Sequence, residues 1–481
     1  MGRTFCYSRP KKDLPETLIS YLCVKFPYFT REQWIQQIEC GNLRVERKPK
    51  HQGKRRRRDG EGDDALGESS GPSGVLPTVP DQILQQSDLI CYDPPRQLEP
   101  EVDATHLEVL YEGETSVVVV KNGCLPVTEG GRYCRNTLIH ILNELPSLSS
   151  FYTERTVVSP RLSATPEATL NMNLNGERQT GGVTRYWSVH RLDKETSGVL
   201  LVAKNVQTAA GYAQQFMSQA EETVLEEGAL RPPEAPSPHR SGDVIVCNAD
   251  EKPIFTKAIA DKPVCKTYYA VLSGAAPVGT VPQYRITYKI GLLWEDEANR
   301  TDAHVRLKKL KMMAYPSDAS VGKPACTFIT VLASDTALGV SFARISLLTG
   351  RTHQIRVHCA ALGFPVLGDK LYSTATPGVA GHAVAVADSV YLARAQDTEK
   401  RVFLPDHLQP RWCCRRHLLH AGALAFTHAE TQQRVRFTAL CAPWFLPDVR
   451  GRDEAEDAAL SHFILQRMPR SHRDGEGHFV K

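Results

Sequence analysis

An uninterrupted apolar run, Val-Leu-Leu-Val-Ala, spans residues 199–203 and follows a segment that is almost entirely polar. A short aliphatic run bounded by a turn signal is typical of a fully buried strand. The turn signal is Thr-Ser-Gly at 196–198, and Asp193 lies in the polar segment before it. We therefore expect Asp193 on a loop at the mouth of a core strand, where a rigid scaffold can aim a carboxylate into a cleft. The alternative is a plain turn, in which Asp193 bonds to nearby backbone N–H groups.

Other segments rich in β-branched and aromatic residues predict further strands. Two of them flank residues 112–115 and form a hairpin pattern between 107 and 120. The remaining elements are expected as strands at 266–272, 340–348, 418–426 and 434–438 and as helices at 136–142, 206–217 and 351–363. Hairpins, rather than a regular strand–helix–strand alternation, indicate the α+β class.

Residues 14–46 have the spacing of a small helical unit, with leucines that recur at helical intervals. Thr30 and Gln33 form a capping-box pattern before a second helix. Gly41 fits the C-cap of that helix, and residues 43–45 alternate as a strand begins. We expect two short helices followed by a strand.

A basic block runs from Arg44 to Arg58 and is followed by a stretch at 59–73 that is first acidic and then rich in Gly and Ser. Such a block is a nucleic-acid contact, a nuclear signal or a solvated linker. The composition of the following stretch favours a disordered linker, with nuclear import as the second interpretation.

The chain is long enough, at 481 residues, for two or three domains. Three stretches without a hydrophobic period interrupt the strand-rich region and indicate insertions at about 146–183, 221–260 and 374–414. The predicted parts are an N-terminal module (1–47), a basic and acidic linker (48–79), a completion of the module with a strand near 83–90 (80–106), a main domain (107–446) and a C-terminal tail (447–481).

Composition is ordinary for a soluble globular protein, with 41% hydrophobic residues, 23% charged residues and a net charge of +4. No apolar run approaches the roughly 20 residues of a membrane span, so we expect no membrane partner. The 13 cysteines are scattered without a CxxC or a paired Cys/His spacing. This pattern predicts no metal site, and reduced thiols in an intracellular compartment.

The segment HRLDKETSGVLLVAK at 190–204 resembles the active-site motif of the RluA family of RNA pseudouridine synthases. Three more segments are similar to that family in the expected order: KTYYAVLSG at 266–274, LLTGRTHQIRVHCAALGFPVLGDKLY at 347–372 and LHAGALAFTHAET at 419–431. Four ordered motifs of this length are a strong signal. The resemblance implies the pseudouridine synthase fold, with a mixed, mainly antiparallel central sheet and flanking helices.

Three further segments refine the resemblance. Residues 111–127 are similar to the segment before the active site, although the family's Lys-Pro step is Lys121-Asn122 here. Residues 131–142 are closest to a eukaryotic branch that includes tRNA-modifying members, which makes tRNA the favoured RNA and leaves rRNA and mRNA open. Residues 30–49 resemble the S4-type RNA-binding module, with a generic helical hairpin as the alternative.

The resemblance also implies the catalytic groups. Pseudouridine formation breaks the N1–C1′ bond, rotates the base and rejoins it through C5, which requires neither metal nor cofactor. Asp193 matches the family's catalytic aspartate and would act as nucleophile or base. To stay ionised in a dry pocket it needs a nearby cation. Arg351, the first Arg of the family's RTHQIR segment, is the expected partner, with a phosphate or helix-surface contact as the alternative.

Tyr268 matches the family's active-site tyrosine, whose ring would stack on the extruded uracil; otherwise it is one more strand aromatic. Because side chains alternate along a strand, Tyr269 should face away from the cleft. Loop support or RNA contacts are expected from His190, Arg191, Lys266, Arg44 and Lys48. Packing roles around the following helix are expected for His353, Arg356 and His358.

The same motifs bear on other possible functions. The main alternative is a catalytically inactive RNA-binding or RNA-assembly factor with the same fold. A protein kinase is excluded because the Asp of HRLD is displaced by one residue and no D-F-G follows. A zinc deaminase is excluded because its P-C-x-x-C signature is absent. We expect a monomer in the cytoplasm or nucleus; the basic, acid-free first twelve residues keep mitochondria open.

Overall fold

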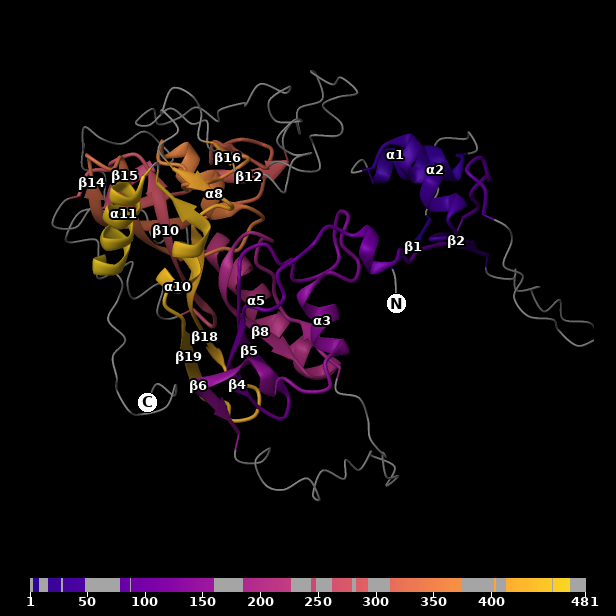
Figure 1. Ribbon diagram of the computed structural model, residues 1–481, viewed down its shortest axis with the longest axis horizontal. Helices are drawn as coiled ribbons and strands as arrows, with labels where there is room; N and C mark the ends of the chain where they lie inside the picture. The colour runs from indigo at the N-terminus through magenta and orange to yellow at the C-terminus, as the bar shows by residue number, and fades with distance from the viewer. Residues whose placement is uncertain are drawn as a thin grey trace, which may run out of the picture. The chain divides into compact units, whose positions relative to one another are not determined.

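The computed structural model forms two compact units, each with its own core (Figure 1). The first is Met1–Glu101 with Thr128–His140, and the second is Val102–Val127 with Ile141–Lys481. The residues that the structure describes are 3–7, 16–26, 29–47, 78–86, 88–159, 185–225, 244–247, 262–278, 283–292, 312–372, 402–403, 412–451 and 453–467.

The first unit is a three-stranded antiparallel sheet, in the order β1-β3-β2, that packs against two helices. Its elements are β1 (Arg3–Cys6), α1 (Leu18–Lys25), α2 (Arg31–Glu39), β2 (Leu43–Glu46), β3 (Leu89–Tyr92) and the 3₁₀ turn η1 (Arg96–Leu98). Trp34 of α2 is buried in its core, with its ring edge-on to that of Tyr92.

The local signals predicted for this unit are confirmed. Thr30 and Gln33 form the capping box at the start of α2, and Gly41 adopts a left-handed φ of 72° after its end. The closing strand is present as β3, at 89–92, slightly later than expected. The resemblance to the S4-type module stays a prediction. Most of the expected linker, 48–77, lies outside the described residues.

The second unit is built on a 12-stranded sheet in which most neighbours are antiparallel. The order is β6-β4-β5-β8-β18-β10-β15-β14-β11-β9, with β7 on β8 and β19 on β18. The strands are β4 (Leu107–Glu112), β5 (Ser116–Lys121), β6 (Tyr152–Val158), β7 (Trp187–Ser188), β8 (Ser197–Ala203), β9 (Val244–Cys247), β10 (Cys265–Ser273), β11 (Gln283–Ile286), β14 (Thr327–Asp335), β15 (Val340–Leu347), β18 (Leu419–Thr427) and β19 (Arg434–Thr438). Only β4–β6 and β8–β18 pair in parallel among these described strands.

Helices and smaller sheets complete the second unit. They are α3 (Leu138–Glu144, which begins in the first unit), η2 (Ser149–Phe151), α5 (Val206–Leu225), α8 (Gln354–Ala361), α10 (Ala442–Phe445), η6 (Leu446–Asp448) and α11 (Glu454–Arg467), with β12 (Lys289–Leu292) paired to β13 (Met312–Tyr315) and β17 (Cys413–Cys414) between β16 (Val402–Phe403) and β20 (Val449–Arg450). The α+β class and the mixed, mainly antiparallel sheet with flanking helices are therefore confirmed.

Two apolar cores hold this sheet to its helices. One joins β4, β5, β8 and β18 to Tyr212 of α5. The other joins β10 and β15 to α10 and α11, which Figure 1 draws against these strands. The predicted core strand is β8, and all seven of its residues are buried. Its burial anchors the loop that precedes it.

The predicted insertions and tail need correction. Residues 152–158, expected in an insertion, form β6 at one end of the sheet, and 244–247 form β9 at the other. Strand β6 has no hydrophobic period because most of its side chains are exposed. Trp412, expected in the third insertion, is buried in the core. Residues 160–184, 226–243 and 373–401 of the predicted insertions lie outside the described residues.

The predicted C-terminal tail is also wrong for its described residues, which include a packed helix. Residues 454–467 form α11, and the three buried side chains of that helix are Leu460, Phe463 and Ile464. Their spacing of three and four residues puts them on one helix face. That face packs into the same core as Phe342 of β15. The helix therefore belongs to the second unit.

Candidate active site

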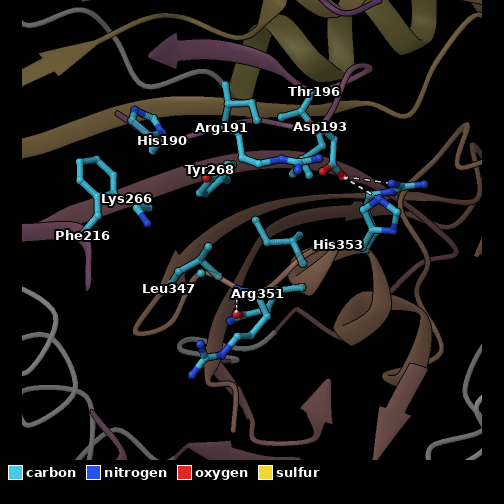
Figure 2. A pocket seen from close by; sticks show the side chains of 16 residues that line it. His190, Arg191, Asp193, Thr196, Phe216, Lys266, Tyr268, Leu347, Arg351 and His353 are labelled. Atoms are coloured by element: carbon cyan, nitrogen blue, oxygen red, sulfur yellow. Dashed lines mark hydrogen bonds and ion pairs between the residues drawn. The ribbon is translucent and has the colours of Figure 1, made fainter. Parts of the chain in front are cut away.

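A pocket of about 260 Å³ opens beside the loop that precedes β8. Its walls come from that loop, the start of β10, the end of β15, the turn into α8, and α5. Figure 2 shows Asp193 and His353 at one end and Lys266 and Phe216 at the other. Segments far apart in the chain thus meet around one cavity.

A close backbone approach positions the loop. The Thr196 N–H donates to the Asp193 carbonyl at 3.0 Å and closes a turn. Strand β8 then pairs with β18, with Gly198 opposite Ala421. Gly198 has a φ of 125°, and a Cβ there would lie 2.3 Å from the Ala421 carbonyl oxygen, so glycine is required. The expected place of Asp193, on a polar loop before a buried strand, is confirmed.

A chain of charged groups holds the Asp193 carboxylate. Arg356 of α8 donates from Nη1 to Asp193 Oδ2 at 3.0 Å. The same guanidinium makes a two-point contact with Asp369, with Nε–Oδ2 at 2.6 Å and Nη2–Oδ1 at 3.0 Å. Asp369 is fully buried and also accepts from the Leu371 and Tyr372 N–H groups. Since a two-point contact fixes the plane of a guanidinium, Asp369 aims Nη1 at Asp193.

These contacts control the charge of Asp193. Burial alone would raise the pKa of Asp193, but His353 and Arg356 act in the opposite direction and the net pKa is lowered. Burial also opposes the charge of Arg356, yet Asp369 and Asp193 raise the pKa of Arg356 well above its ordinary value. The carboxylate is therefore ionised at neutral pH and the guanidinium is its lasting counter-charge.

His353 contacts Asp193 from the turn into α8. The hydroxyl of Tyr372 accepts from the Met312 N–H and lies 2.9 Å from His353 Nδ1, to which it can donate. The proton of the neutral imidazole then belongs on Nε2, which lies 3.8 Å from Asp193 Oδ2. Burial lowers the pKa of His353 to about 4 despite the attraction of Asp193, so the imidazole is neutral at pH 7. Its backbone φ of 58° is uncommon for a non-glycine residue.

Tyr268 lines the pocket from β10, whereas Tyr269 stacks on Phe342 in the core at 5.9 Å between ring centroids. The predicted alternation of the two tyrosines is confirmed. Burial, and then the negative charge of Asp193, raise the pKa of Tyr268. The phenol therefore keeps its proton at neutral pH and presents a neutral ring and hydroxyl.

The expected pairing of Arg351 with Asp193 is wrong, because Arg356 occupies that position. Arg351 donates from Nε to the Pro324 carbonyl at 2.9 Å and its backbone N–H donates to Gln354 Oε1. It lines the pocket but points away from Asp193 (Figure 2). The predicted helix began at 351, whereas α8 begins at 354. The later start places Arg356, which we expected only to pack, in its first turn.

An ion pair beside the site, formed by Glu195 and Lys370, was not predicted from the sequence. Glu195 accepts from Lys370 Nζ at 2.6 Å, next to the contact of Asp369 with Arg356. The pair is mostly buried, with side-chain exposures of 13% for Glu195 and 9% for Lys370. Residues 369 and 370 thus hold both ends of the short segment 193–195. The only sequence signal was the matched segment that contains Asp369.

Lys121 of β5 supports the loop that carries Asp193. Its side chain is fully buried, and its Nζ donates to the Asn122 carbonyl at 2.8 Å and the Lys194 carbonyl at 3.1 Å. Burial, and then the charge of Arg416, lower the pKa of Lys121 to about 7. Asn122, which replaces the family's proline, donates to the Asp103 carbonyl. The departure from Lys-Pro therefore leaves the lysine bound to the loop.

The predicted RNA-contact residues have different positions. His190 stacks on Phe216 with 4.5 Å between centroids and its Nε2 accepts from the Leu201 N–H, so it supports the loop. Burial lowers the pKa of His190 to about 3. Arg191 is exposed at the pocket, and Lys266 lies inside it.

Arg44 belongs to the first unit, where its Nε contacts Glu46 at 2.8 Å on an exposed surface. Lys48 lies outside the described residues. Their RNA contacts stay predictions.

The described part of the chain shows neither a metal-binding cluster nor a membrane-spanning helix. It holds no group of three or more His, Cys, Asp or Glu side chains arranged to bind a metal ion. None of its helices combines the length and the apolar character needed to cross a membrane.

Comparisons with known proteins match the same region. A family model described as RNA pseudouridylate synthase matches residues 155–225 and 248–361. RNA pseudouridine synthase 2, chloroplastic, of Arabidopsis thaliana is 28% identical over 53% of this chain and 43% of its own length. Ribosomal large subunit pseudouridine synthase D of Neisseria meningitidis is 27% identical over 69% of this chain and 58% of its own length. The chain thus spans about half the length of these relatives.

Other matches agree in name. RNA pseudouridine synthase 5 of Oryza sativa is 26% identical over 80% of this chain and 78% of its own length. The solved structure of human RNA pseudouridylate synthase domain containing 1 aligns with 76% of this chain and 97% of its own, at 18% identity and a TM-score of 0.36. The family model, the named relatives and the four ordered motifs agree, and together they support an RluA-type RNA pseudouridine synthase.

Proposed function

We propose that this chain converts uridine to pseudouridine in RNA, with Asp193 as the reacting carboxylate. The observation that carries the proposal is an ionised carboxylate at the end of a pocket, beside the Tyr268 ring and held by Arg356. A carboxylate of this kind can act as nucleophile or base without a metal or an organic cofactor. The match to the family model supports the same reaction.

The reaction is an isomerisation, so atoms and electrons balance within the nucleotide. The N1–C1′ bond breaks, the base rotates, and a C5–C1′ bond forms. The proton at C5 leaves and a proton is added to N1. Asp193 would attack C6 of the base or C1′ of the ribose, or remove the proton at C2′. In each case the attacking oxygen must be unprotonated, which the contact with Arg356 favours.

Tyr268 would hold the uracil by stacking. Its raised pKa makes a phenolate uncommon at neutral pH, so it is a weak base while Asp193 is charged. Formation of a covalent bond to Asp193 would remove that negative charge and one of the two causes of the raised pKa. Assistance with loss of the C5 proton would therefore come late in the reaction, after Asp193 has reacted.

A stacked uridine in folded RNA must leave its helix to reach Asp193, at a cost of a few kcal/mol. Arg191 is exposed at the pocket next to the catalytic loop, where it could replace the extruded base or contact the backbone. Phosphate contacts from cationic side chains would position the RNA without reading its sequence.

We propose tRNA as the favoured RNA, on the resemblance of residues 131–142 to the eukaryotic branch. One relative is named for the ribosomal large subunit, which keeps rRNA as an alternative. We propose the cytoplasm or nucleus as the compartment, with mitochondria as the alternative. Pseudouridines can be mapped across all cellular RNA with and without the gene. The RNA that loses a pseudouridine identifies the substrate, and the compartment that contains this RNA tests the proposed location.

A tritium-release assay on RNA labelled at C5 of uridine tests the activity itself. Release by the wild-type chain is expected, since the C5 hydrogen leaves in every turnover. An inactive RNA-binding factor would bind the labelled RNA and release no tritium. That result, with total cellular RNA from a strain lacking the gene as substrate, would overturn the proposal.

A further inference from the structure

Lys266 carries a positive charge inside the pocket, on the strand that also carries Tyr268. Both side chains line the cavity and are two residues apart on β10, which is about 7 Å along a strand. This spacing is comparable to the distance between a base and its own backbone phosphate. The Lys266 ammonium lies 4.7 Å from the centroid of the Phe216 ring, at the opposite end of the pocket from Asp193 (Figure 2).

No Asp or Glu among the residues that the structure describes forms an ion pair with Lys266. Burial is the cause that lowers the pKa of Lys266, to about 8, so it is still protonated at pH 7. Asp193, the carboxylate of the pocket, is already held by Arg356. Lys266 is half-buried. An ammonium in such a place without a counter-charge is destabilised, and an anionic ligand would stabilise it.

The surroundings of the ammonium leave room for such a ligand. A Cβ on Gly350 would lie 3.2 Å from Lys266 Nζ, so the glycine keeps this side of the ammonium open. The next residue, Arg351, lines the same pocket, and its Nε donates to the Pro324 carbonyl. His190 is neutral at pH 7 because its pKa is about 3. This end of the pocket therefore has two cations.

We infer that Lys266 binds a backbone phosphate that flanks the uridine in the pocket, with Arg351 as the second cation of this site. The inference rests on the proposed function for the nature of the ligand, an RNA strand. A phosphate satisfies the lysine as a compact point charge and the arginine as a hydrogen-bonding fork. The site would set how far the strand enters, and so place the base at Tyr268 and Asp193.

A thermodynamic cycle between protein and RNA tests the contact. The probe is a short oligoribonucleotide with one uridine in a run of cytidines, made with ordinary phosphates or with an uncharged methylphosphonate on one side of the uridine. Its dissociation constant is measured for the wild-type chain and for Lys266→Met, which keeps the side-chain stem. Lys323→Met is the matched control, because Lys323 is exposed and outside the pocket lining.

The wild-type chain should bind the charged probe about tenfold more tightly than the probe neutralised at one of the two flanking positions. Lys266→Met should bind the charged probe more weakly and should keep only the smaller part of this difference that Arg351 supplies. Its slope of log affinity against log salt should be shallower by about 0.7. Lys266→Arg should restore most of the difference. Lys323→Met should behave as the wild type does.

Two outcomes would overturn the inference. If Lys266→Met weakens the binding of both probes by the same factor, the preference for the charged probe keeps its wild-type size. The lysine then contacts the base instead of a phosphate. If it lowers the melting temperature and leaves binding unchanged, the lysine only packs on Phe216. The cycle measures binding, so it is independent of turnover: coupling without tritium release would retain the phosphate site and remove the proposed activity.

Discussion

The two ends of the pocket handle charge in opposite ways. At one end Asp193, Arg356 and Asp369 form a closed set of contacts, in which every charged group has a partner within the protein. At the other end Lys266 has no ion-pair partner among the described residues. The guanidinium of Arg351 donates from Nε to the Pro324 carbonyl, which carries no formal charge. The first arrangement fixes a reacting group before the ligand arrives, and the second needs the ligand to complete it.

The difference has a physical reason. A carboxylate that must stay unprotonated in a buried place requires a permanent counter-charge. Preorganised groups also cost little further reorganisation during reaction. A binding group, in contrast, gains most from an anion when no protein carboxylate competes for it. Substitutions at the first end should therefore change turnover, and those at the second should change affinity.

The largest effect is expected from Asp193→Asn. The amide cannot act as the nucleophile or base, so tritium release should fall to the background of the assay. RNA affinity should change by less than about 1 kcal/mol, because one group of a large polar interface is altered. Filter binding beside the release assay measures both. Pseudouridine formation by the variant would show that another group reacts.

The next largest effect is expected from Arg356→Met, compared with Arg351→Met. The first change leaves Asp193 and Asp369 without their partner, so kcat should fall by about a hundredfold and unfolding free energy by about 3–5 kcal/mol. The second should raise KM with kcat within about threefold, because Arg351 does not touch Asp193. Steady-state kinetics and urea unfolding separate the two.

Arg356→Lys guards against simple misfolding in this comparison. It keeps the charge but loses the two-point contact with Asp369, so the protein should fold with reduced kcat. The pKa of Asp193 should then rise, and the acidic limb of the kcat profile should move to higher pH. Equal losses in the Arg351 and Arg356 variants would contradict the assignment of the counter-ion.

A smaller effect is expected from the contact between Glu195 and Lys370. Lys370→Met and Glu195→Gln should each lower kcat about tenfold, because the pair holds the loop that carries Asp193. The double variant should be no worse than either single variant, since both remove the same contact. Additive losses would mean that the two residues act separately. RNA affinity should stay unchanged in all three.

The smallest effect is expected from pH. As pH rises through about 8, free Lys266 loses its proton, so kcat/KM should fall about threefold while kcat changes less, because a bound phosphate would raise that pKa. The groups at its own end of the pocket, neutral His190 and cationic Arg351, do not titrate there. Lys266→Arg should lack this limb. A limb that persists in the variant belongs to another group, such as Lys121 with its pKa of about 7.

Local patterns in the sequence were enough for several parts of this protein. The capping box at Thr30 and Gln33, the buried run of β8 and the opposite faces of Tyr268 and Tyr269 were all predicted and found. Each depends on residues a few positions apart, where backbone geometry dictates the outcome. Edge strand β6 was missed because its exposed side chains lack a hydrophobic period.

The sequence alone thus determined that Asp193 lies on a loop before a core strand, and which tyrosine faces it. Only the tertiary structure decided that Arg356 rather than Arg351 is its counter-ion, that Asp369 and Lys370 hold the loop, and that Lys266 lacks an ion-pair partner among the described residues. Two arginines five residues apart differ by where a helix begins and which way it packs. Partners more than a hundred residues apart in the chain are brought together only by the folded sheet.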